Sequence, residues 1–522
     1  MGHMHGSAFI VVAIYMAGML WIGLSFAGRQ TSTETYFVAR RSVPAWAMGF
    51  SLFATLISSV TFVAYPGSAY AGNWSLLTPG IMVLGVLLLI GLVVIPFFRH
   101  VVHMSAYEYL GKRFGTVARL YGSSAFALTT FAKMTFVFYL VALTINSMTG
   151  WDITYVIIAI GVVTVFYALV GGVEAVIWTD VVQGFVLWLG IFITLAYLMF
   201  LPPGGPSAVF SLAWHHGKFG LGSTRVNFSQ PTIIVLLLYG FFWYLQKYTG
   251  DQTVVQRYLV AKSDREALKG VGMGAILSIP VWTLFMLIGT STWAFFRLTH
   301  AKLPAYITKP DQVFPYFLTS RIPGPLAGLI LSSLLAAAMS TLSSDLNCLA
   351  VVGVEDFYRT FRRETSDRER LTVAKLTVGV CGSLCVVTAM ILARSHGTAL
   401  SLWYTASAIV AGGLAGLFFL AFLSIRANKQ GAHIGIGACV AFTAWATLTL
   451  HGKQTINLGR YNFPMHSYMI GVIGNLVLFG VGYAASYLFP NADSSKKHMT
   501  LWGWLEQRGS GNPKKAETPV GR

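Results

Sequence analysis

One apolar run of the sequence, residues 324–353, carries a polar stretch at its centre, which reads Ala337-Ala338-Met339-Ser340-Thr341-Leu342-Ser343-Ser344-Asp345-Leu346-Asn347. A run of this length crosses a bilayer core of about 30 Å as a single helix. Polar groups are costly inside a membrane and by default indicate a functional site. The stretch therefore predicts a membrane-spanning helix with one functional face.

The composition of the whole chain extends this prediction. Of its 522 residues, 55% are hydrophobic and only 10% are charged, against about 25% charged in an ordinary soluble domain. A soluble chain of this length would form several domains and cover them with charge. The composition therefore excludes a soluble enzyme, a disulfide scaffold and a disordered chain, and it predicts an all-α polytopic membrane protein.

Thirteen apolar runs are long enough to span a membrane, since a span needs roughly 20 residues. The runs are 8–27, 45–66, 77–98, 118–146, 153–171, 178–201, 232–249, 267–297, 324–353, 371–393, 399–425, 431–451 and 466–489. An odd number of spans places the two termini on opposite sides of the membrane.

The net charge of +18 arises from 36 Lys and Arg against 18 Asp and Glu. With the N-terminus outside, 23 of the basic residues lie in inner connections and in the tail 490–522, and 9 lie in outer connections. Because basic residues favour the cytoplasmic side, this bias predicts an outside N-terminus and a cytoplasmic tail in the plasma (inner) membrane. The basic residues are scattered rather than gathered on one folded face. We therefore expect the lipid bilayer as the surroundings, no nucleic-acid partner and no obligatory protein partner.

Two of the predicted spans are interrupted. The run 45–66 ends at Tyr65-Pro66-Gly67 after several polar residues, and the run 232–249 ends at Thr249-Gly250-Asp251-Gln252. Interrupted helices at corresponding places in two halves of a transporter mark a binding site near the middle of the bilayer.

These interruptions also predict how the chain is divided. Residues 1–489 would form one transmembrane domain, and residues 490–522 its cytoplasmic tail. Within the domain we expect an extra N-terminal helix, two inverted repeats and two C-terminal helices, which are 8–27, 45–201, 232–425 and 431–489.

Small and hydroxyl-bearing residues line one face of two predicted spans. They are Ala337, Ser340, Thr341 and Ser344, flanked by Ser343, in one span, and Ala54, Ser58 and Thr61, with Ile57 on the same face, in the other. Both sets follow the i, i+3, i+4, i+7 spacing of a helix face. Such a stripe lets two helices pack closely, and it also brings neutral oxygens near carbonyl groups freed at a break. Since neutral oxygens suit a monovalent cation such as sodium, packing and a sodium site are alternatives, and the cost of membrane polar groups favours the second.

Two charged residues need an explanation. Asp180, at the start of the run 178–201, is either an interfacial helix cap or a carboxylate that attracts a cation beside the serines. Lys133 lies in the middle of the apolar run 118–146, where a buried ammonium needs a partner. That partner would be Asp180, Asp345 or a carboxylate of the substrate, unless Lys133 extends to the membrane surface.

Five motifs, in this order, resemble those of the sodium/solute symporter family. They are Tyr36-Phe37-Val38-Ala39-Arg40-Arg41-Ser42, Ser105-Ala106-Tyr107-Glu108-Tyr109-Leu110-Gly111-Lys112-Arg113-Phe114-Gly115, the Gly-Gly…Thr-Asp-Val-Val-Gln run at 171–183, Asp251-Gln252-Thr253-Val254-Val255-Gln256-Arg257-Tyr258-Leu259, and the serine-rich span. The resemblance implies sodium-coupled uptake by alternating access, on a LeuT-like five-plus-five inverted-repeat fold with broken first helices.

The resemblance also implies sodium ligands. The sodium site shared by the family maps to Ala54, Ile57, Ala337, Ser340 and Thr341. A second sodium site, which some members have, maps to Asp180, Ser340, Ser343 and Ser344. We therefore expect one sodium ion or two.

Within the family the chain looks most similar to the sialic acid transporters and next to the monocarboxylate branch. That similarity implies a solute site at Ser58, Thr61 and Lys133, although Lys133 replaces an Arg and Leu56 stands where a polar contact is expected. We expect a carboxylate-bearing solute, with a sugar or another neutral solute as the alternative. An uncoupled channel and a membrane-embedded enzyme are remote alternatives, since a channel usually carries a ring of charges and the histidines nearest the spans, His396, His451 and His466, lie at span ends.

Overall fold

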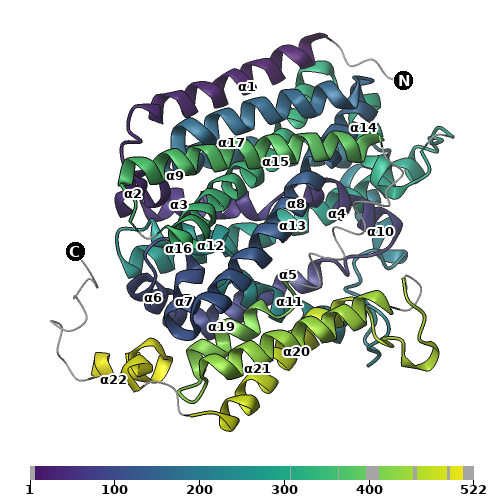
Figure 1. Cartoon of the computed structure of the whole chain (residues 1–522). Coiled ribbons are helices and arrows are strands. Elements are labelled where there is room, and N and C mark those ends of the chain that lie inside the picture. Colours follow the sequence, from purple (N-terminus) through teal and green to yellow (C-terminus); the bar gives the residue numbers. More distant parts are fainter. Residues whose placement is uncertain are drawn as a thin grey trace.

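The computed structural model describes residues 6–305, 307–362, 364–394, 411–450, 455–490 and 494–509, and the regular structure in these ranges is helical (Figure 1). The α-helices are α1 (Gly6–Ala27), α2 (Thr33–Val38), α3 (Ala45–Leu56), α4 (Ser59–Ala71), α5 (Leu77–Val86), α6 (Leu92–Val101), α7 (Ala106–Phe114), α8 (Thr116–Thr149), α9 (Ile153–Phe200), α10 (Gly205–His215), α11 (Ile233–Thr249), α12 (Gln252–Leu259), α13 (Asp264–Leu298), α14 (Val313–Arg321), α15 (Gly324–Val352), α16 (Arg359–Phe361), α17 (Asp367–Arg394), α19 (Leu414–Leu423), α20 (Lys429–Leu448), α21 (Tyr468–Ala485) and α22 (Leu501–Gly509). Shorter 3-10 and π segments are η1 (Ala39–Arg41), η2 (Leu87–Gly91), η3 (Pro310–Gln312), η4 (Gly353–Tyr358), η5 (Gly459–Tyr461), η6 (Ser486–Leu488) and η7 (Ser494–Met499).

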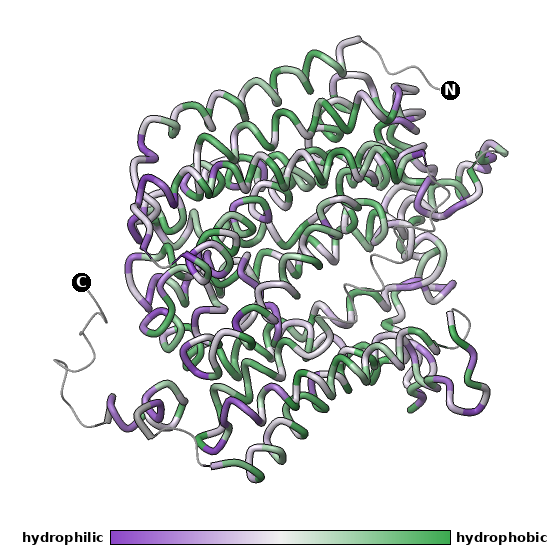
Figure 2. Tube along the Cα trace, in the orientation of Figure 1, coloured by the Kyte–Doolittle hydropathy of each residue, from purple (hydrophilic) through white to green (hydrophobic). Residues whose placement is uncertain are grey.

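The long helices run side by side from one end of the molecule to the other (Figure 1). In this view α1 lies along one edge of the array, and the pair α20 and α21 lies along the opposite edge. Figure 2 shows hydrophobic residues along the lengths of the helices and hydrophilic residues gathered toward the two ends. This distribution is that of helices crossing an apolar layer between two aqueous phases.

Within the described residues, nine helices are long and apolar enough to cross a membrane, or ten if the bent pair α3–α4 forms one span. The prediction of an all-helical polytopic membrane protein is therefore confirmed. The difference from thirteen predicted spans has three sources. The runs 153–171 and 178–201 both lie in α9, α11 has only 17 residues, and part of 399–425 lies outside the described residues.

A break inside α9 separates its two predicted runs. Gly172 has φ 59° and ψ −165°, a conformation that favours glycine. A Cβ at this position would lie 2.7 Å from Oε1 of Gln30. The hydroxyl of Tyr36 lies 3.2 Å and 3.1 Å from the carbonyl oxygens of Ala168 and Leu169, so it satisfies backbone groups freed at the break.

Helix α15, which carries the polar stretch, lies at the centre of the protein. In its most apolar stretch of 18 residues, 89% of the residues are buried, against 17% in the corresponding stretch of α1 and 28% in that of α17. It packs against α9, α1, α8, α17 and α3. The polar residues at its centre therefore face other helices rather than lipid.

Candidate functional site

The first interrupted span breaks between α3 and α4, whose axes differ in direction by 57°. Helix α3 ends at Leu56, and the backbone of Ile57 (φ −98°, ψ 112°) and of Ser58 (φ −111°, ψ 173°) is extended before α4 begins at Ser59. A helix end leaves its last carbonyl groups without partners in the same helix. The break therefore frees carbonyl oxygens in the interior of the protein.

Hydroxyl groups of α15 approach these carbonyl groups. Oγ of Ser340 donates to the carbonyl oxygen of Ala54 at 2.9 Å and lies 3.3 Å from that of Ala337. Oγ1 of Thr341 lies 3.2 Å from the carbonyl oxygen of Ala337 and 3.5 Å from that of Thr55. The structure thus brings together four of the five residues implied for the shared sodium site, with Ile57, the fifth, at the break itself.

This group of oxygens fits a sodium ion. The oxygens are neutral, and Ala54, Ile57, Ala337, Ser340 and Thr341 are buried. Hard, weakly bound cations prefer such hydroxyl and carbonyl ligands. A divalent cation usually attracts several carboxylates, so these uncharged donors suit a monovalent cation better than a divalent one.

Asp180 is buried inside α9 and is not an interfacial cap, because the helix continues on both sides of it. Its Oδ2 accepts from Oγ of Ser51 at 2.6 Å and from Nη2 of Arg257 at 3.2 Å, and the two charged side chains are fully buried. Arg257 also donates to Oγ of Ser344. Oδ1 of Asp180 is buried and makes no hydrogen bond within the described part of the chain.

The residues implied for the second sodium site are only partly together. Ser344 lies 3.5 Å from Oδ2 of Asp180, whereas Ser340 is bonded to α3 and Oγ of Ser343 lies 3.3 Å from the carbonyl oxygen of Ser340. The free Oδ1 of Asp180 is a buried carboxylate oxygen that a cation would satisfy. Arg257 is the functional residue that the sequence interpretation missed. The signal that could have found it is that a buried carboxylate such as Asp180 needs a cationic partner.

Lys133 has a partner on α15. Its Nζ donates to Oδ1 of Asp345 at 2.8 Å, and the Asp345 side chain is fully buried while that of Lys133 is 38% exposed. Of the three partners considered from the sequence, the structure selects Asp345. Oδ2 of Asp345 is buried and makes no hydrogen bond within the described residues.

Ser58 and Thr61 lie at the start of α4, on the far side of the break from α3. The backbone N–H of Ser58 lies 3.5 Å from Oγ1 of Thr61, which is buried. Among the described residues no hydrogen bond joins either of them to Lys133. The structure therefore places the three implied solute ligands on two different elements, α4 and α8.

The second interrupted span breaks between α11 and α12. Asp251 caps α12, because its Oδ1 accepts from the N–H of Thr253 at 2.9 Å, and its Oδ2 accepts from Nζ of Lys247. The hydroxyl of Tyr107, on α7, donates to the carbonyl oxygen of Gly250 at 2.8 Å. Side chains of the protein therefore form hydrogen bonds with the backbone groups that are left free at this break.

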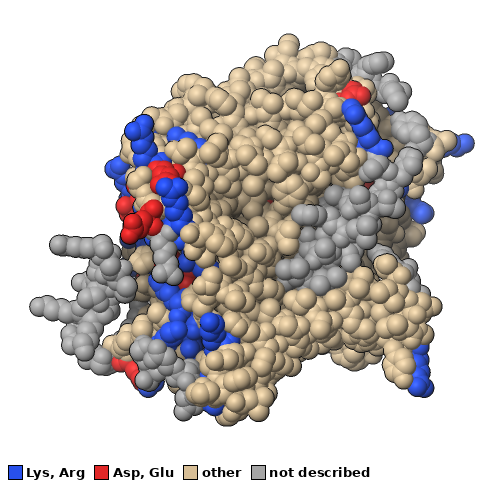
Figure 3. Space-filling model, viewed as in Figure 1, with Lys and Arg blue, Asp and Glu red and all other residues tan. Residues whose placement is uncertain are grey.

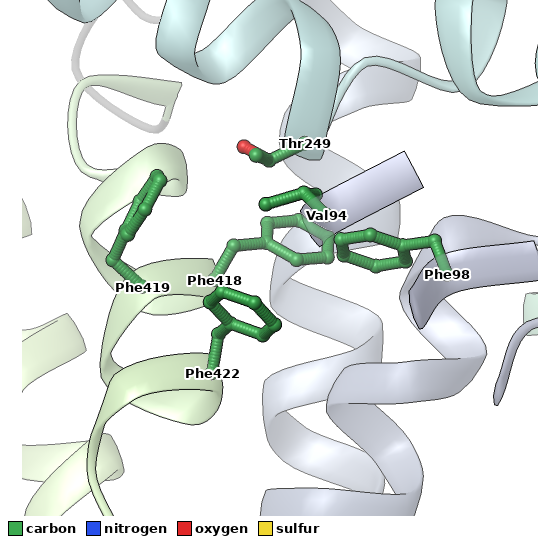
Figure 4. A pocket seen from close by; sticks show the side chains of 6 residues that line it. All are labelled: Val94, Phe98, Thr249, Phe418, Phe419 and Phe422. Atoms are coloured by element: carbon green, nitrogen blue, oxygen red, sulfur yellow. The ribbon is translucent and has the colours of Figure 1, made fainter. Parts of the chain in front are cut away.

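A narrow apolar gap lies beside the second break (Figure 4). Its lining residues are Val94, Phe98, Thr249, Phe418, Phe419 and Phe422. The gap has no room for a water molecule, and Thr249 is its one polar lining residue. Helices α6, α11 and α19 thus pack closely around these side chains.

The carboxyl end of α4 is held by a lysine from the segment that follows α10. Nζ of Lys218 donates to the carbonyl oxygens of Tyr70 at 2.7 Å and Gly72 at 3.0 Å, at the end of α4. Burial, aided by the nearby charge of Arg297, lowers the pKa of Lys218. A cation at the carboxyl end of a helix stabilises that end.

A family model described as the sodium:solute symporter family matches residues 36–438. The chain belongs to this family. This sodium/solute symporter is 31% identical to the sodium/sialic acid symporter NanT of Aliivibrio fischeri over 504 residues, which cover 96% of this chain and 97% of that one. It is 30% identical to the human sodium-coupled monocarboxylate transporter 1 over 470 residues, covering 87% and 75% of the two chains. The prediction of a transporter rather than an enzyme is confirmed.

Solved structures agree with this assignment. A Na+-coupled sialic acid symporter in a substrate-bound, outward-open state, for which a novel Na+ site is described, matches with a TM-score of 0.87 at 31% identity, covering 94% of this chain and 99% of that one. Mhp1, a nucleobase-cation-symport-1 family transporter, matches with a TM-score of 0.58 at 14% identity, covering 89% of this chain and 97% of that one, a likeness of fold alone. The symporter therefore has the LeuT-like fold, and it couples a solute to sodium.

Proposed function

We propose that this symporter imports a small organic solute by alternating access, driven by sodium that enters with it. The observation that carries the proposal is the approach of Ser340 and Thr341 on α15 to the last carbonyl groups of α3. A sodium ion bound at Ala54, Ile57, Ala337, Ser340 and Thr341 would join α3 to α15. Because the break between α3 and α4 begins at the same place, binding of the ion would fix the angle of the interrupted span.

The arrangement in the membrane is part of this proposal. We propose one transmembrane domain, 1–489, with thirteen spans, two five-helix inverted repeats over 45–201 and 232–425, and a cytoplasmic tail, 490–522. Figure 3 supports the orientation, because on the face shown most Lys and Arg lie along the end of the molecule where α22 lies. Basic residues favour the cytoplasmic side, so that end would face the cytoplasm, with the protein in the plasma (inner) membrane and the N-terminus outside.

A second sodium ion would bind at Asp180, Ser340, Ser343 and Ser344. The free Oδ1 of Asp180 supports this site, while the ion pair of Asp180 with Arg257 satisfies the other oxygen. The two sites share Ser340, so their occupancies would be coupled. Each sodium ion supplies about 2.3 kcal/mol per 100 mV of membrane potential to the import of solute.

The solute would bind at Ser58, Thr61 and Lys133. The charge of Lys133, and the relatives named for sialic acid and for monocarboxylates, favour a carboxylate-bearing solute. A neutral solute, such as a sugar, is the second candidate, and the observation that favours it is the ion pair between Lys133 and Asp345.

Uptake by the purified protein in proteoliposomes tests the proposed function. Radiolabelled acids and sugars would be offered with an inward gradient of sodium or of potassium, and an inside-negative potential should increase the sodium-driven rate. Uptake that is equal in the two gradients for every accumulated solute would contradict sodium coupling at this site.

A further inference from the structure

Three ion pairs in the described part of the chain have a carboxylate whose side chain is fully buried. They are Asp180–Arg257, Asp345–Lys133 and Asp356–Arg119. They differ in the exposure of the cation, which is 0% for Arg257, 21% for Arg119 and 38% for Lys133. They differ also in whether one or both oxygens of the carboxylate accept hydrogen bonds.

Asp356 uses both carboxylate oxygens, because Oδ1 accepts from Arg119 and Oδ2 accepts from Ser105. Asp345 uses only Oδ1, and its Oδ2 is buried without a partner in the described residues. Among the three pairs, Lys133–Asp345 alone combines a free carboxylate oxygen with the most exposed cation. A buried polar atom without a partner requires an explanation, such as a ligand that satisfies it.

The exposed part of Lys133 faces the inside of the protein. Lys133 lies near the middle of α8 (Thr116–Thr149), and at 1.5 Å per residue it is about 25 Å from either end of that helix. A lysine side chain is too short to reach an interface over that distance, and an ammonium that faced lipid at mid-bilayer would be very costly. The exposed surface of Lys133 therefore borders a space between helices, next to the buried Asp345.

We propose that Lys133 and Asp345 act as one selectivity element, which binds a neutral solute with adjacent hydroxyl groups and disfavours solutes with a free carboxylate. This inference rests on the proposed function, because it assigns a solute class to the same transport site, and of the two classes considered there it selects the neutral one. In it, Asp345 is a specificity-determining residue that holds the ammonium of Lys133 and presents its own free oxygen to the solute.

The hydrogen-bonding capacity of the pair matches vicinal hydroxyl groups. An ammonium has three N–H donors, of which Lys133 gives one to Asp345. The remaining donors and the free Oδ2 of Asp345 form neighbouring donor and acceptor positions. Each hydroxyl group both donates and accepts, so two adjacent hydroxyls would satisfy both positions at once.

The charge balance disfavours a carboxylate. The pair is neutral as a unit, and the second pair within electrostatic reach, Lys247–Asp251, is neutral as well. An anionic solute that bound the two remaining donors of Lys133 would share one ammonium with Asp345, and the site would then carry a net negative charge. Two carboxylates close together in a low-dielectric interior repel each other, whereas a neutral solute leaves the charge of the pair balanced.

The experiment measures solute selectivity of the purified full-length protein by thermal shift, in sodium and in potassium. The panel pairs each neutral solute with its acid: hexoses with uronic acids, pentoses with aldonic acids, and polyols with sugar acids. In sodium, we expect at least one neutral member to raise the melting midpoint, with an apparent affinity about 10-fold or more above that of its acid, which corresponds to about 1.4 kcal/mol.

Variants of the pair assign this selectivity to Asp345. Asp345→Asn frees the ammonium of Lys133, and the ratio of acid to neutral affinity should rise about 10-fold or more. The double variant Lys133→Gln with Asp345→Asn is uncharged at both positions and therefore keeps the charge of the site balanced. It can replace the single variant if that one does not fold. In the double variant, the ratio of acid to neutral affinity should approach one. The matched control is Glu506→Gln, which breaks the exposed pair Lys497–Glu506 and should leave the ratio unchanged.

Three results would overturn the inference: a wild-type protein that binds acids more tightly than their neutral counterparts, a panel in which no neutral member binds, or an Asp345→Asn variant with an unchanged ratio. Failure of the proposed function has a different signature. If a neutral solute binds equally well in sodium and in potassium, the proposed sodium coupling is contradicted. The ratio of acid to neutral affinity can still be measured in that case, so the selectivity element is tested separately.

Discussion

The two interrupted spans differ in the side chains that form hydrogen bonds with the free backbone groups at each break. After α3, the carbonyl groups of Ala54 and Thr55 are met by Ser340 and Thr341, hydroxyls from another helix. After α11, Asp251 of the same span caps the next helix, and the carbonyl group of Gly250 accepts from the hydroxyl of Tyr107.

This difference indicates which break can respond to an ion. A hydroxyl–carbonyl contact between two helices is neutral, and a sodium ion that binds both groups can replace it. Asp251, by contrast, is bonded to Thr253 and Lys247 on its own span, so both oxygens are occupied. We therefore expect sodium to act on the break after α3, while the break after α11 serves as a fixed joint.

The largest effect is expected at the fixed joint. Asp251→Ala removes the cap of α12 and leaves the mostly buried Lys247 without its partner, and we expect a loss of about 2–3 kcal/mol in stability. The melting midpoint of the purified protein measures this loss. Asp152→Ala is the control, because Asp152 caps α9 in the same way, with a bond of 2.8 Å to the N–H of Thr154, at an exposed position. Equal midpoints for the two variants would mean that Asp251 stabilises the protein no more than an exposed helix cap does, which would contradict a fixed joint after α11.

A second prediction concerns the number of ions held between α15 and its neighbours. The double variant Asp180→Asn with Ser343→Ala should lower the Hill coefficient of uptake for sodium toward one, because it removes the charge and a hydroxyl of the second site. Thr179→Val is the control, since the hydroxyl of Thr179 lies 2.9 Å from the carbonyl oxygen of Ala175 in its own helix. An unchanged coefficient in the double variant would eliminate the second ion and leave a single site at the break.

The smallest effect is expected from loosening the fixed joint at one hydrogen bond. Tyr107→Phe removes the bond to the carbonyl oxygen of Gly250 and should cost about 1 kcal/mol of stability and slow sodium-driven uptake. Tyr109→Phe removes a similar bond, 2.9 Å to the carbonyl oxygen of Met499, and should cost as much stability while leaving the uptake rate unchanged. Equal uptake rates for the two variants would mean that the joint plays no part in transport.

Much of the site after α3 could be predicted from the sequence, because helix geometry fixes which residues share a face. The spacing of Ala337, Ser340 and Thr341 placed them on one stripe, and the polar residues of the second span marked the break that the stripe meets. Asp345 was one of three candidate partners for Lys133, and the choice among them required the packing of α8 against α15.

Other features could not be predicted, because they depend on contacts between distant segments. Arg257 lies 77 residues from Asp180 in the sequence, and nothing in its local pattern names its partner. That the runs 153–171 and 178–201 form one helix with a kink depends on the φ of Gly172, which a glycine permits but does not require.

Sodium binding to the purified protein tests the central claim most directly. The melting midpoint is measured as a function of the sodium concentration, and potassium at equal ionic strength serves as the control. Wild-type protein should be stabilised by sodium and not by potassium, as a ligand that binds the folded state requires. Ser340→Ala should weaken sodium binding about 10-fold or more. Ser332→Ala should not, because Oγ of Ser332 bonds the carbonyl oxygen of Gly328 within α15. A Ser340→Ala protein that binds sodium with wild-type affinity would contradict a sodium site between α3 and α15.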